Sequence, residues 1–289
     1  MTPTVIRTVA ELRQHVANLR ASGETVALIP TMGALHDGHL SLVRKAIKDG
    51  HQSIVSIFVN PTQFNDPKDL EKYPRDEATD VALLAPLNVS AVFAPSADEM
   101  YSDGYSTTVS VSGVSEGLCG AARPGHFDGV ATVVSKLLLQ CLPDAAYFGK
   151  KDFQQISVIN RVVIDLNIPV QIVGCPILRE ADGLAMSSRN VRLTEKGRII
   201  AGQLNVVMRE CAQDIAAGSK VASRLKDAKS QIMAAGFTDI DYLEMRSSAD
   251  LKPIEKLDQP ARLFVAAFLD NVRLIDNFEV GAEVGKRTS

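Results

Sequence analysis

The sequence lacks tryptophan altogether and has few aromatic residues and few cysteines, 5% and four among 289 residues. No apolar run approaches the roughly 18 residues that a membrane-spanning helix needs. The cysteines are widely spaced and form no C-x-x-C pair. This argues against a disulfide framework or a cysteine-based zinc site, and for a reducing, cytoplasmic setting. We expect each cysteine to be a small buried apolar residue.

An excess of basic residues is also absent. Lysine and arginine number 31 against 34 acidic residues, a net charge of −3. Because the chain has no excess of positive charge, we do not expect it to bind a nucleic acid. The hydrophobic content of 46% and the charged content of 22% are those of an ordinary globular protein. The segment 1–20 lacks the basic-then-apolar build of a signal peptide, and Thr8 with Glu11 predicts a capping box at a helix start.

Short apolar runs alternate with helical patterns along the first part of the chain. Residues 130–141 and 156–166 carry apolar side chains at helical spacing. Apolar strands separated by amphipathic helices predict an α/β fold, a Rossmann-like parallel sheet flanked by helices. The segment 105–118 alternates differently, which leaves an edge strand or an excursion open. The predicted strands are 25–30, 53–60, 90–95, 145–149 and 170–176.

The pattern changes after the last of these strands. Two long helical segments follow, each closed by a glycine, Gly218 and Gly236. Helices followed by antiparallel strands predict a second, smaller α+β domain. We place the first domain at residues 1–178 and the second at 179–289. The strand-like segments of the second domain are 240–248, 261–270 and 272–280.

The turn after the first predicted strand contains two histidines, His36 and His39, within LIPTMGALHDGHLSLV. A helix is predicted to start near Gly38, and its N-terminus would offer unpaired N–H groups and a positive dipole end to a phosphate. Gly33 and Gly38 would let a nucleotide approach the backbone, and the histidines would donate to phosphate oxygens. The residue types also leave open structural histidines, or a metal pair that would need a third ligand.

Two further turns carry polar side chains suited to a nucleotide. FGKKDFQQ (148–155) places two lysines and Asp152 between a strand and a helix, where lysine suits a phosphate and the acid a ribose or a magnesium-bound water. READGLAMSSRNVRLT (179–194) is a polar loop in which Ser187, Ser188 and Arg189 could close over a triphosphate. An ordinary capped turn and a hinge loop are the respective alternatives.

Two other segments carry amides and an arginine. FVNPTQF (58–64) puts Asn60 and Gln63 just beyond a strand, where amides could bind hydroxyl or carboxylate oxygens. An Asn-Pro turn is the alternative. RPGHFDGVATVV (123–134) offers Arg123 as a ligand contact, or is only a loop and a helix start.

Taken together, these segments resemble the pantothenate synthetase (pantoate–β-alanine ligase) family. The matching stretches occur in the family's order and span residues 30–277. H-x-G-H alone marks the wider superfamily of class I aminoacyl-tRNA synthetases and nucleotidylyltransferases, whereas its combination with FVNPTQF and MSSRN is specific. The stretches are PTMGALHDGHLSLV, FVNPTQF, YPR, RPGHFDGVATVVSKL, FGKKDFQQ, READGLAMSSRN and VRLIDN.

The resemblance implies a condensation of pantoate with β-alanine in two steps. The carboxylate of pantoate attacks the α-phosphate of ATP, giving pantoyl adenylate and pyrophosphate, and the amine of β-alanine then displaces AMP. The resemblance further implies Mg²⁺ that arrives with ATP, a second domain that closes over the adenylate, and a homodimer.

The resemblance also assigns site residues. His39 matches the family's proton donor, but a carboxylate needs no deprotonation, so electrostatic stabilisation by the histidine pair is the more economical role. The catalytic set is His36, His39, Lys151 and Arg189. The pantoate and β-alanine contacts are Gln63, Gln155, Asn60 and Arg123. The ATP contacts are Met32, Gly33, Ala34, Leu35, His36, Asp37, Gly38, His39, Gly149, Lys150, Lys151, Asp152, Leu178, Met186, Ser187, Ser188 and Arg189. No metal ligand is assigned.

One position departs from the family pattern. Many relatives have Gly-Glu-Lys-Asp where this chain has GKKD, so Lys150 replaces an acid and adds positive charge. Two other functions stay open. One is a different nucleotidylyltransferase of the same fold. The other is a nucleotide sensor without catalysis, against which the intact His36, His39, Lys151 and Arg189 argue.

Overall fold

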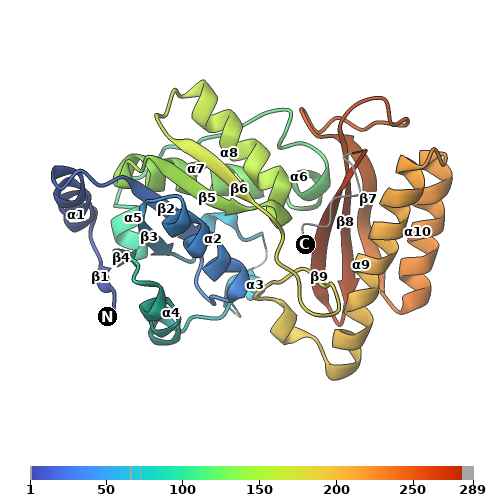
Figure 1. Cartoon of the computed structure of the whole chain (residues 1–289), viewed down its shortest axis with the longest axis horizontal. Helices are drawn as coiled ribbons and strands as arrows, with labels where there is room; N and C mark the ends of the chain where they lie inside the picture. The colour runs from blue at the N-terminus through green and yellow to red at the C-terminus, as the bar shows by residue number, and fades with distance from the viewer. Residues whose placement is uncertain (1, 66, 72, 282–289) are drawn as a thin grey trace. The chain divides into compact units, whose positions relative to one another are not determined.

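The computed structural model describes residues 2–65, 67–71 and 73–281. The chain forms two compact units, Met1–Pro176 and Ile177–Ser289, and each is described by itself (Figure 1). The sequence places the domain boundary slightly later, between residues 178 and 179.

The first unit is built on a six-stranded sheet in which every strand pair is parallel, in the order β1-β4-β3-β2-β5-β6. This confirms the predicted α/β fold. β1 was missed because a strand of 3 residues carries too little pattern. The chain order reverses between β2 and β5, so a ligand is expected at their carboxyl ends. The strands are β1 (Thr4–Ile6), β2 (Val26–Thr31), β3 (Gln52–Ile57), β4 (Ala91–Phe93), β5 (Ala145–Gly149) and β6 (Gln171–Cys175).

Helices cover both faces of this sheet (Figure 1). Side chains alternate along β2, so Leu28 packs in one buried cluster while Ala27 and Ile29 pack in another on the opposite face. Burying one such large side chain contributes about 1.5–3 kcal/mol. The helices are α1 (Val9–Ala21), α2 (Asp37–Lys48), α3 (Pro67–Glu71), α4 (Glu77–Leu84), α5 (Ala97–Met100), α6 (Leu118–Ala122), α7 (His126–Cys141) and α8 (Phe153–Asp165).

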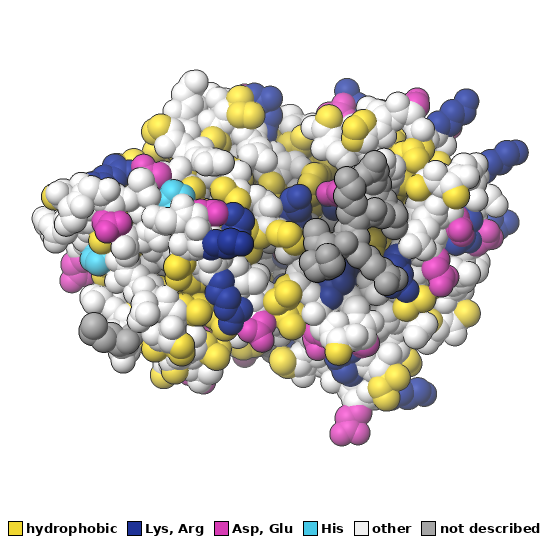
Figure 2. Space-filling model, viewed as in Figure 1, with side chains coloured by type: hydrophobic (Ala, Val, Ile, Leu, Met, Phe, Trp, Pro, Cys, Tyr) yellow, Lys and Arg dark blue, Asp and Glu magenta, His cyan; other side chains and the backbone are white. Residues whose placement is uncertain are grey.

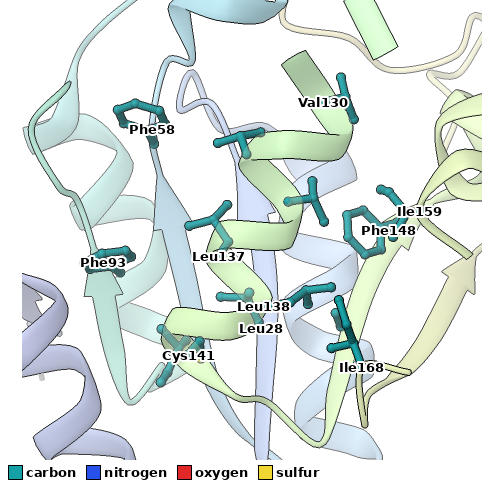
Figure 3. Close-up of a cluster of buried hydrophobic side chains, with 14 of the residues drawn as sticks. Leu28, Phe58, Phe93, Val130, Leu137, Leu138, Cys141, Phe148, Ile159 and Ile168 are labelled. Atoms are coloured by element: carbon teal, nitrogen blue, oxygen red, sulfur yellow. The ribbon is translucent and has the colours of Figure 1, made fainter. Parts of the chain in front are cut away.

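Helix α7 supplies the centre of the first cluster, as its apolar stripe predicts. Figure 3 shows its side chains packed among residues of the sheet and of α8. The contacting residues include Val130, Leu137, Leu138 and Cys141 of α7 with Leu28, Phe93, Phe148 and Ile159. This packing holds β2 and β5, and therefore the turns that follow them, in fixed positions.

Two local predictions for the first unit can be compared with the structure. The capping box is confirmed, since Thr8 Oγ1 accepts the Glu11 N–H at 3.2 Å and Glu11 Oε2 accepts the Thr8 N–H at 3.0 Å. The segment 105–118 contains no strand and runs into α6, so it is an excursion. Its Val109 N–H donates to Thr132 Oγ1 of α7 at 2.9 Å.

The second unit is a three-stranded antiparallel sheet with two helices, which confirms the predicted α+β architecture. The apolar side chains of its helices and strands form one buried cluster. Helix α10 ends at Gly236, which has a φ of 115°. The elements are α9 (Glu195–Ala216), α10 (Val221–Ala235), β7 (Asp239–Ser247), β8 (Ala261–Leu269) and β9 (Val272–Val280), with strand order β7-β8-β9.

The surface and the cysteines are as composition suggests. Acidic and basic side chains are interspersed over the face shown in Figure 2. Among the described residues, no helix is both long and apolar enough to cross a membrane. No disulfide joins the four cysteines. Cys141, Cys175 and Cys211 are buried as expected, whereas Cys119 is only partly buried.

Candidate active site

The turn between β2 and α2 is held by a carboxylate from another helix. Gly33 and Ala34 have φ angles of 78° and 50°, a left-handed backbone that is costly for a residue with a Cβ. Asp80 of α4 accepts the N–H of Ala34 at 3.0 Å and that of Leu35 at 2.7 Å. Asp80 is only 3% exposed. These two N–H groups are thus used inside the protein, where they shape the turn.

Two effects act in opposite directions on the pKa of the Asp80 carboxyl. Burial raises the pKa of its carboxyl, while the two N–H bonds act in the opposite direction. The carboxylate also comes so close to Gly33 that a Cβ there would lie 2.9 Å from Asp80 Oδ2. Glycine is therefore required both by the φ angle and by the space.

His36 is the N-cap of α2, which begins at Asp37, one residue before the predicted start. Its Nδ1 accepts the Gly38 N–H at 3.1 Å. A neutral imidazole with Nδ1 as acceptor carries its proton on Nε2. His39 lies in the first turn of α2, and the two ring centroids are 4.1 Å apart. The sequence prediction of a histidine pair around a helix start is confirmed.

His39 is held neutral by its surroundings. Burial, then His36, then Lys151 lower its pKa to about 3. Its Nδ1 is enclosed and has no hydrogen-bond partner among the described residues. His36 and His39 follow β2 and Lys151 follows β5, so all three lie beyond the carboxyl ends of neighbouring strands. An added anion would find two imidazoles and an ammonium group close together.

Lys151 belongs to the turn after β5, where residues Lys150–Asp152 form a single 3-10 turn before α8. Its Nζ lies 4.0 Å from Asp152 Oδ2, a partly exposed pair whose stabilising effect is small. Gln155 is half-buried in the first turns of α8, whereas its neighbour Gln154 is buried and accepts the N–H of Cys119 at 3.0 Å. Gln154 therefore holds the chain near α6, and Gln155 is the glutamine left for a ligand.

Gln63 lies in a 3-10 turn after β3, close to the turn 32–35 that joins β2 to α2. Its Nε2 is 2.9 Å from the sulfur of Met32. Asn60 is 1% exposed, and its Nδ2 donates to Gln63 Oε1 and to the Gly129 carbonyl, each at 3.1 Å. The Tyr101 hydroxyl donates to Asn60 Oδ1 at 2.7 Å. The Oε1 of Gln63 is thus occupied, and its Nε2 is turned towards Met32 as a donor.

Arg123 approaches Gln63 through the backbone. Its Nη2 donates to the Gln63 carbonyl at 3.2 Å, and its Nη1 lies 3.1 Å from His126 Nε2. His126 Nδ1 is 2.9 Å from the same carbonyl, so this nitrogen carries the proton and donates. A Cβ at Gly129 would lie 2.5 Å from the Thr62 carbonyl, which explains the glycine in HFDG.

A cavity of about 380 Å³ borders these turns. It is large enough for a small organic acid beside Gly33. Its lining includes Met32, Gly33, Phe58, Pro61, Arg75 and Asp80. Among the described residues, no group of three or more His, Cys, Asp or Glu side chains is placed to hold a metal ion.

The remaining predicted nucleotide contacts belong to the second unit. Leu178 and Met186 pair through a hydrogen bond from the Met186 N–H to the Leu178 carbonyl, at 3.0 Å. Ser187, Ser188 and Arg189 follow directly and are all half-buried. The predicted sites therefore fall into two groups, one in each unit.

Three residues of the first group were not found from the sequence: Asp80, Tyr101 and His126. Each acts on a turn that is distant in the chain, so no local pattern marks it. Of the three, only Asp80 could have been noticed in the sequence. It is an acid four residues before the buried Leu84, at a position where the helical pattern predicts an apolar side chain.

Comparisons with known proteins show which family the chain is similar to. Residues 4–279 match the family model described as "Pantoate-beta-alanine ligase". The chain is 56% identical over 280 residues to "Pantothenate synthetase" of Chelativorans sp. (strain BNC1), covering 97% of this chain and 99% of the relative. It is 53% identical over 276 residues to "Pantothenate synthetase" of Paramagnetospirillum magneticum, covering 96% and 97% respectively.

Solved structures show the same similarity. The pantothenate synthetase from Thermus thermophilus matches with a TM-score of 0.90 and 42% identity, over 96% of this chain and 100% of that chain. A pantoate-beta-alanine ligase from Francisella tularensis, complexed with beta-gamma ATP and beta-alanine, matches with a TM-score of 0.79 and 35% identity, over 96% and 97%.

Proposed function

The chain belongs to the pantoate-beta-alanine ligase family, and from this premise we propose how it joins pantoate to β-alanine. ATP activates the pantoate carboxylate as pantoyl adenylate, with release of pyrophosphate. The amine of β-alanine then attacks the acyl carbon and AMP leaves. Activation is needed because a carboxylate has no good leaving group, whereas AMP is one.

The observation that carries this proposal is the placement of His36, His39 and Lys151 after the neighbouring strands β2 and β5, with the two imidazole rings 4.1 Å apart. Negative charge grows on the α-phosphate and pyrophosphate oxygens during attack, and preorganised donors there lower the barrier. Gly38 occupies Nδ1 of His36, so the proton of the neutral ring is on Nε2. His39 starts neutral, and a nearby polyphosphate would raise its pKa, so that it binds a proton and donates as ATP arrives.

Pantoate is proposed to bind at Gln63 and Gln155. Because Asn60 occupies Oε1 of Gln63, the group offered is an N–H donor, which suits a carboxylate or hydroxyl oxygen. Met32 and Phe58 line the adjoining cavity and suit the methyl groups of pantoate. Arg123, which touches the Gln63 carbonyl, and Asn60 are retained as proposed neighbours of the two acids.

The residues present fit a magnesium ion that is carried by ATP. Mg²⁺ at nucleotide sites is held mainly by phosphate oxygens and water, with one or two carboxylates. Asp152, partly exposed beside Lys151, is the carboxylate we propose for a metal-bound water or the ribose. When bound, the ion would neutralise phosphate charge.

The second unit is proposed to complete the nucleotide site with Leu178 and Met186–Arg189, and to shield the adenylate from water as a lid. Further contacts to ATP are proposed for 32–39 and 149–152, at Ala34 and Leu35 through groups other than the N–H groups that Asp80 binds. We also propose a homodimer and a cytoplasmic location, the latter in line with cysteines that form no disulfide.

An assay of the released nucleotide tests the function. The protein is incubated with ATP, Mg²⁺, pantoate and β-alanine, and each acid is omitted in turn. We expect stoichiometric AMP and pyrophosphate only with both acids, and exchange of pyrophosphate into ATP with pantoate alone. A product that retains the nucleotidyl group would instead show a different nucleotidylyltransferase. ATP binding without any turnover would identify a sensor.

A further inference from the structure

Within the second unit, the segment that precedes Met186–Arg189 is a hairpin. Arg179 and Ala185 form an antiparallel bridge. The Glu180 N–H donates to the Leu184 carbonyl at 2.9 Å. The sequence predicts a polar loop here, and these contacts give its first half the structure of a hairpin.

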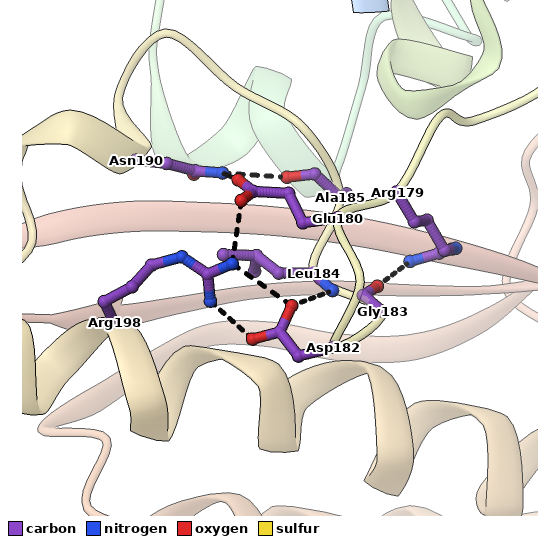
Figure 4. A network of polar contacts seen from close by, with 8 residues as sticks. All are labelled: Arg179, Glu180, Asp182, Gly183, Leu184, Ala185, Asn190 and Arg198. Atoms are coloured by element: carbon purple, nitrogen blue, oxygen red, sulfur yellow. Dashed lines mark hydrogen bonds and ion pairs between the residues drawn. The ribbon is translucent and has the colours of Figure 1, made fainter.

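The hairpin is bound to β9 by a partly buried ion pair. Arg179 binds the carboxylate of Asp276 through two nitrogens, at 2.7 and 3.0 Å, and Asp276 is 4% exposed. Arg179 Nη1 also donates to the Gly183 carbonyl at 3.0 Å (Figure 4). Asp276 lies in VRLIDN, a matched stretch for which the sequence suggested no role. The pair joins this stretch to the loop.

The tip of the hairpin is tied to α9. Arg198 Nη2 donates to Glu180 Oε2 at 2.8 Å and to Asp182 Oδ1 at 3.2 Å (Figure 4). Each of these partly exposed pairs contributes little alone. Together they orient the Glu180 carboxylate, whose other oxygen faces Asn190.

Asn190 closes the segment. Its side chain is 9% exposed, and its Nδ2 donates to Glu180 Oε1 at 2.9 Å and to the Ala185 carbonyl at 3.2 Å. Its backbone N–H donates to the Ser187 carbonyl at 3.0 Å. One amide therefore joins the residue before Met186–Arg189 to the residue after it.

We propose that Asn190 is a positioning residue for the ligase reaction, which holds Ser187, Ser188 and Arg189 in the conformation that binds the nucleotide. This rests on the proposed nucleotide contacts of these three residues. With both ends of the segment joined, its conformational entropy is already lost on folding and is not lost again when ATP binds.

The test is Asn190→Ala in the full chain, with steady-state kinetics for each substrate and a thermal unfolding curve. We expect the KM for ATP to rise about tenfold through lost preorganisation, while the KM values for pantoate and β-alanine stay within about twofold. A variant with merely lowered stability would not separate ATP from the two acids in this way.

Asn277→Ala is the matched control. Asn277 is also a buried amide of the second unit, 2% exposed, and its side chain accepts from Arg262 Nη1 at 2.5 Å. Its backbone N–H donates to Asp276 Oδ1 at 2.8 Å, and alanine keeps that N–H. It should lose comparable thermal stability and keep the wild-type KM for ATP. An ATP-selective rise of the same size in Asn277→Ala would overturn the positioning role.

If Asn190→Ala fails to fold, a second pair of variants tests the positioning role of Asn190. Glu180→Ala and Asp182→Ala each remove one partner of Arg198, but only Glu180 contacts Asn190. We expect an ATP-selective rise of about threefold in the first and none in the second, since the Ala185 contact remains. Equal effects would contradict the proposal.

The wild-type reaction separates this inference from the proposed function. If the wild-type chain releases no AMP with both acids, the function itself fails. If it does, and Asn190→Ala has an unchanged KM for ATP, only the positioning role is overturned.

Discussion

The turn 32–35 of the first unit and the segment 186–189 of the second are both irregular chain with proposed nucleotide contacts, yet they are held in opposite ways. The first is held by an acceptor, the carboxylate of Asp80, which is 46 residues from Ala34 in the sequence. The second is held by a donor, the amide of Asn190, whose partners are 5 and 10 residues away.

This difference has a physical consequence. The turn 32–35 combines left-handed backbone at Gly33 and Ala34 with the buried carboxylate of Asp80. It therefore forms only when α4 is packed against the sheet. Its variants should therefore reduce catalysis and global stability together. The segment 186–189 is closed by a nearby side chain, so its variants should change nucleotide binding more than global stability.

The largest expected effect tests whether His39, in the helix that follows the turn 32–35, takes part in adenylate formation. For His39→Ala we predict that adenylate formation falls about 10²-fold or more, the scale for a lost transition-state donor, with the fold intact. Pyrophosphate release in a single turnover measures this. His51→Ala is the control, because His51 contacts Thr25 Oγ1 at 2.8 Å and lies outside the site. A wild-type rate would remove His39 from the mechanism.

The next effect tests long-range support of the turn. Asp80→Asn keeps one acceptor oxygen but turns an NH₂ group towards one of the two backbone N–H groups. We predict a loss of about 1–3 kcal/mol in the free energy of unfolding and a clear fall in adenylation rate. Urea denaturation and pyrophosphate release measure the two.

Asp144→Asn serves as the control for Asp80→Asn, since Asp144 Oδ2 also accepts a backbone N–H, that of Val26 at 2.8 Å, but at the opposite end of β2 from the turn. Its rate of adenylation should be that of the wild type. If Asp80→Asn changed neither stability nor rate, the contrast between the two segments would fail.

A pair of glycine variants isolates the close approach inside the turn. Gly33 and Gly50 have φ angles of 78° and 91°, but only at Gly33 would a Cβ meet other atoms, Asp80 Oδ2 at 2.9 Å and Ile57 Cγ2 at 3.2 Å. Both alanine variants have the backbone strain. We predict that Gly33→Ala loses about 1 kcal/mol more than Gly50→Ala in chemical denaturation. Equal losses of stability in the two variants would show that the Asp80 and Ile57 side chains move aside at little cost.

The smallest effect is a pH dependence of stability. The pKa of His39 is lowered to about 3, whereas an unfolded chain titrates near 6.5. The unfolded state therefore binds more protons between these values, and the stability present above pH 6.5 is lost as the pH falls. We predict a loss below about 1 kcal/mol from pH 7 to pH 6 from this group. His39→Gln should remove that part of the slope in denaturation curves at the two pH values.

Much of the fold follows from local pattern. Five strands of the parallel sheet and the stripe of α7 were predicted, because buried strands and amphipathic helices must present apolar side chains at fixed spacing. The short β1 could not be found in this way. The helix start at the histidines was also predicted, since glycines and an N-cap position are local features.

The support of the site could not be predicted from pattern. Asn60 was predicted to contact a ligand, but both ends of its amide are bonded inside the first unit, to Tyr101, Gly129 and Gln63 among others. A buried amide and a ligand-binding amide look alike in sequence. Asp80 and His126 were missed because their partners are tens of residues away.

By itself the sequence determined the architecture and the residue types of the proposed site: two imidazoles, a lysine and a glutamine at the ends of parallel strands. These depend on local periodicity, backbone freedom and the position of turns. Only the tertiary structure decided that His39 is neutral, that Gln63 offers a donor, and that Asn190 closes its segment. Protonation and amide orientation depend on burial and on partners from distant segments, which come together only when the chain has folded.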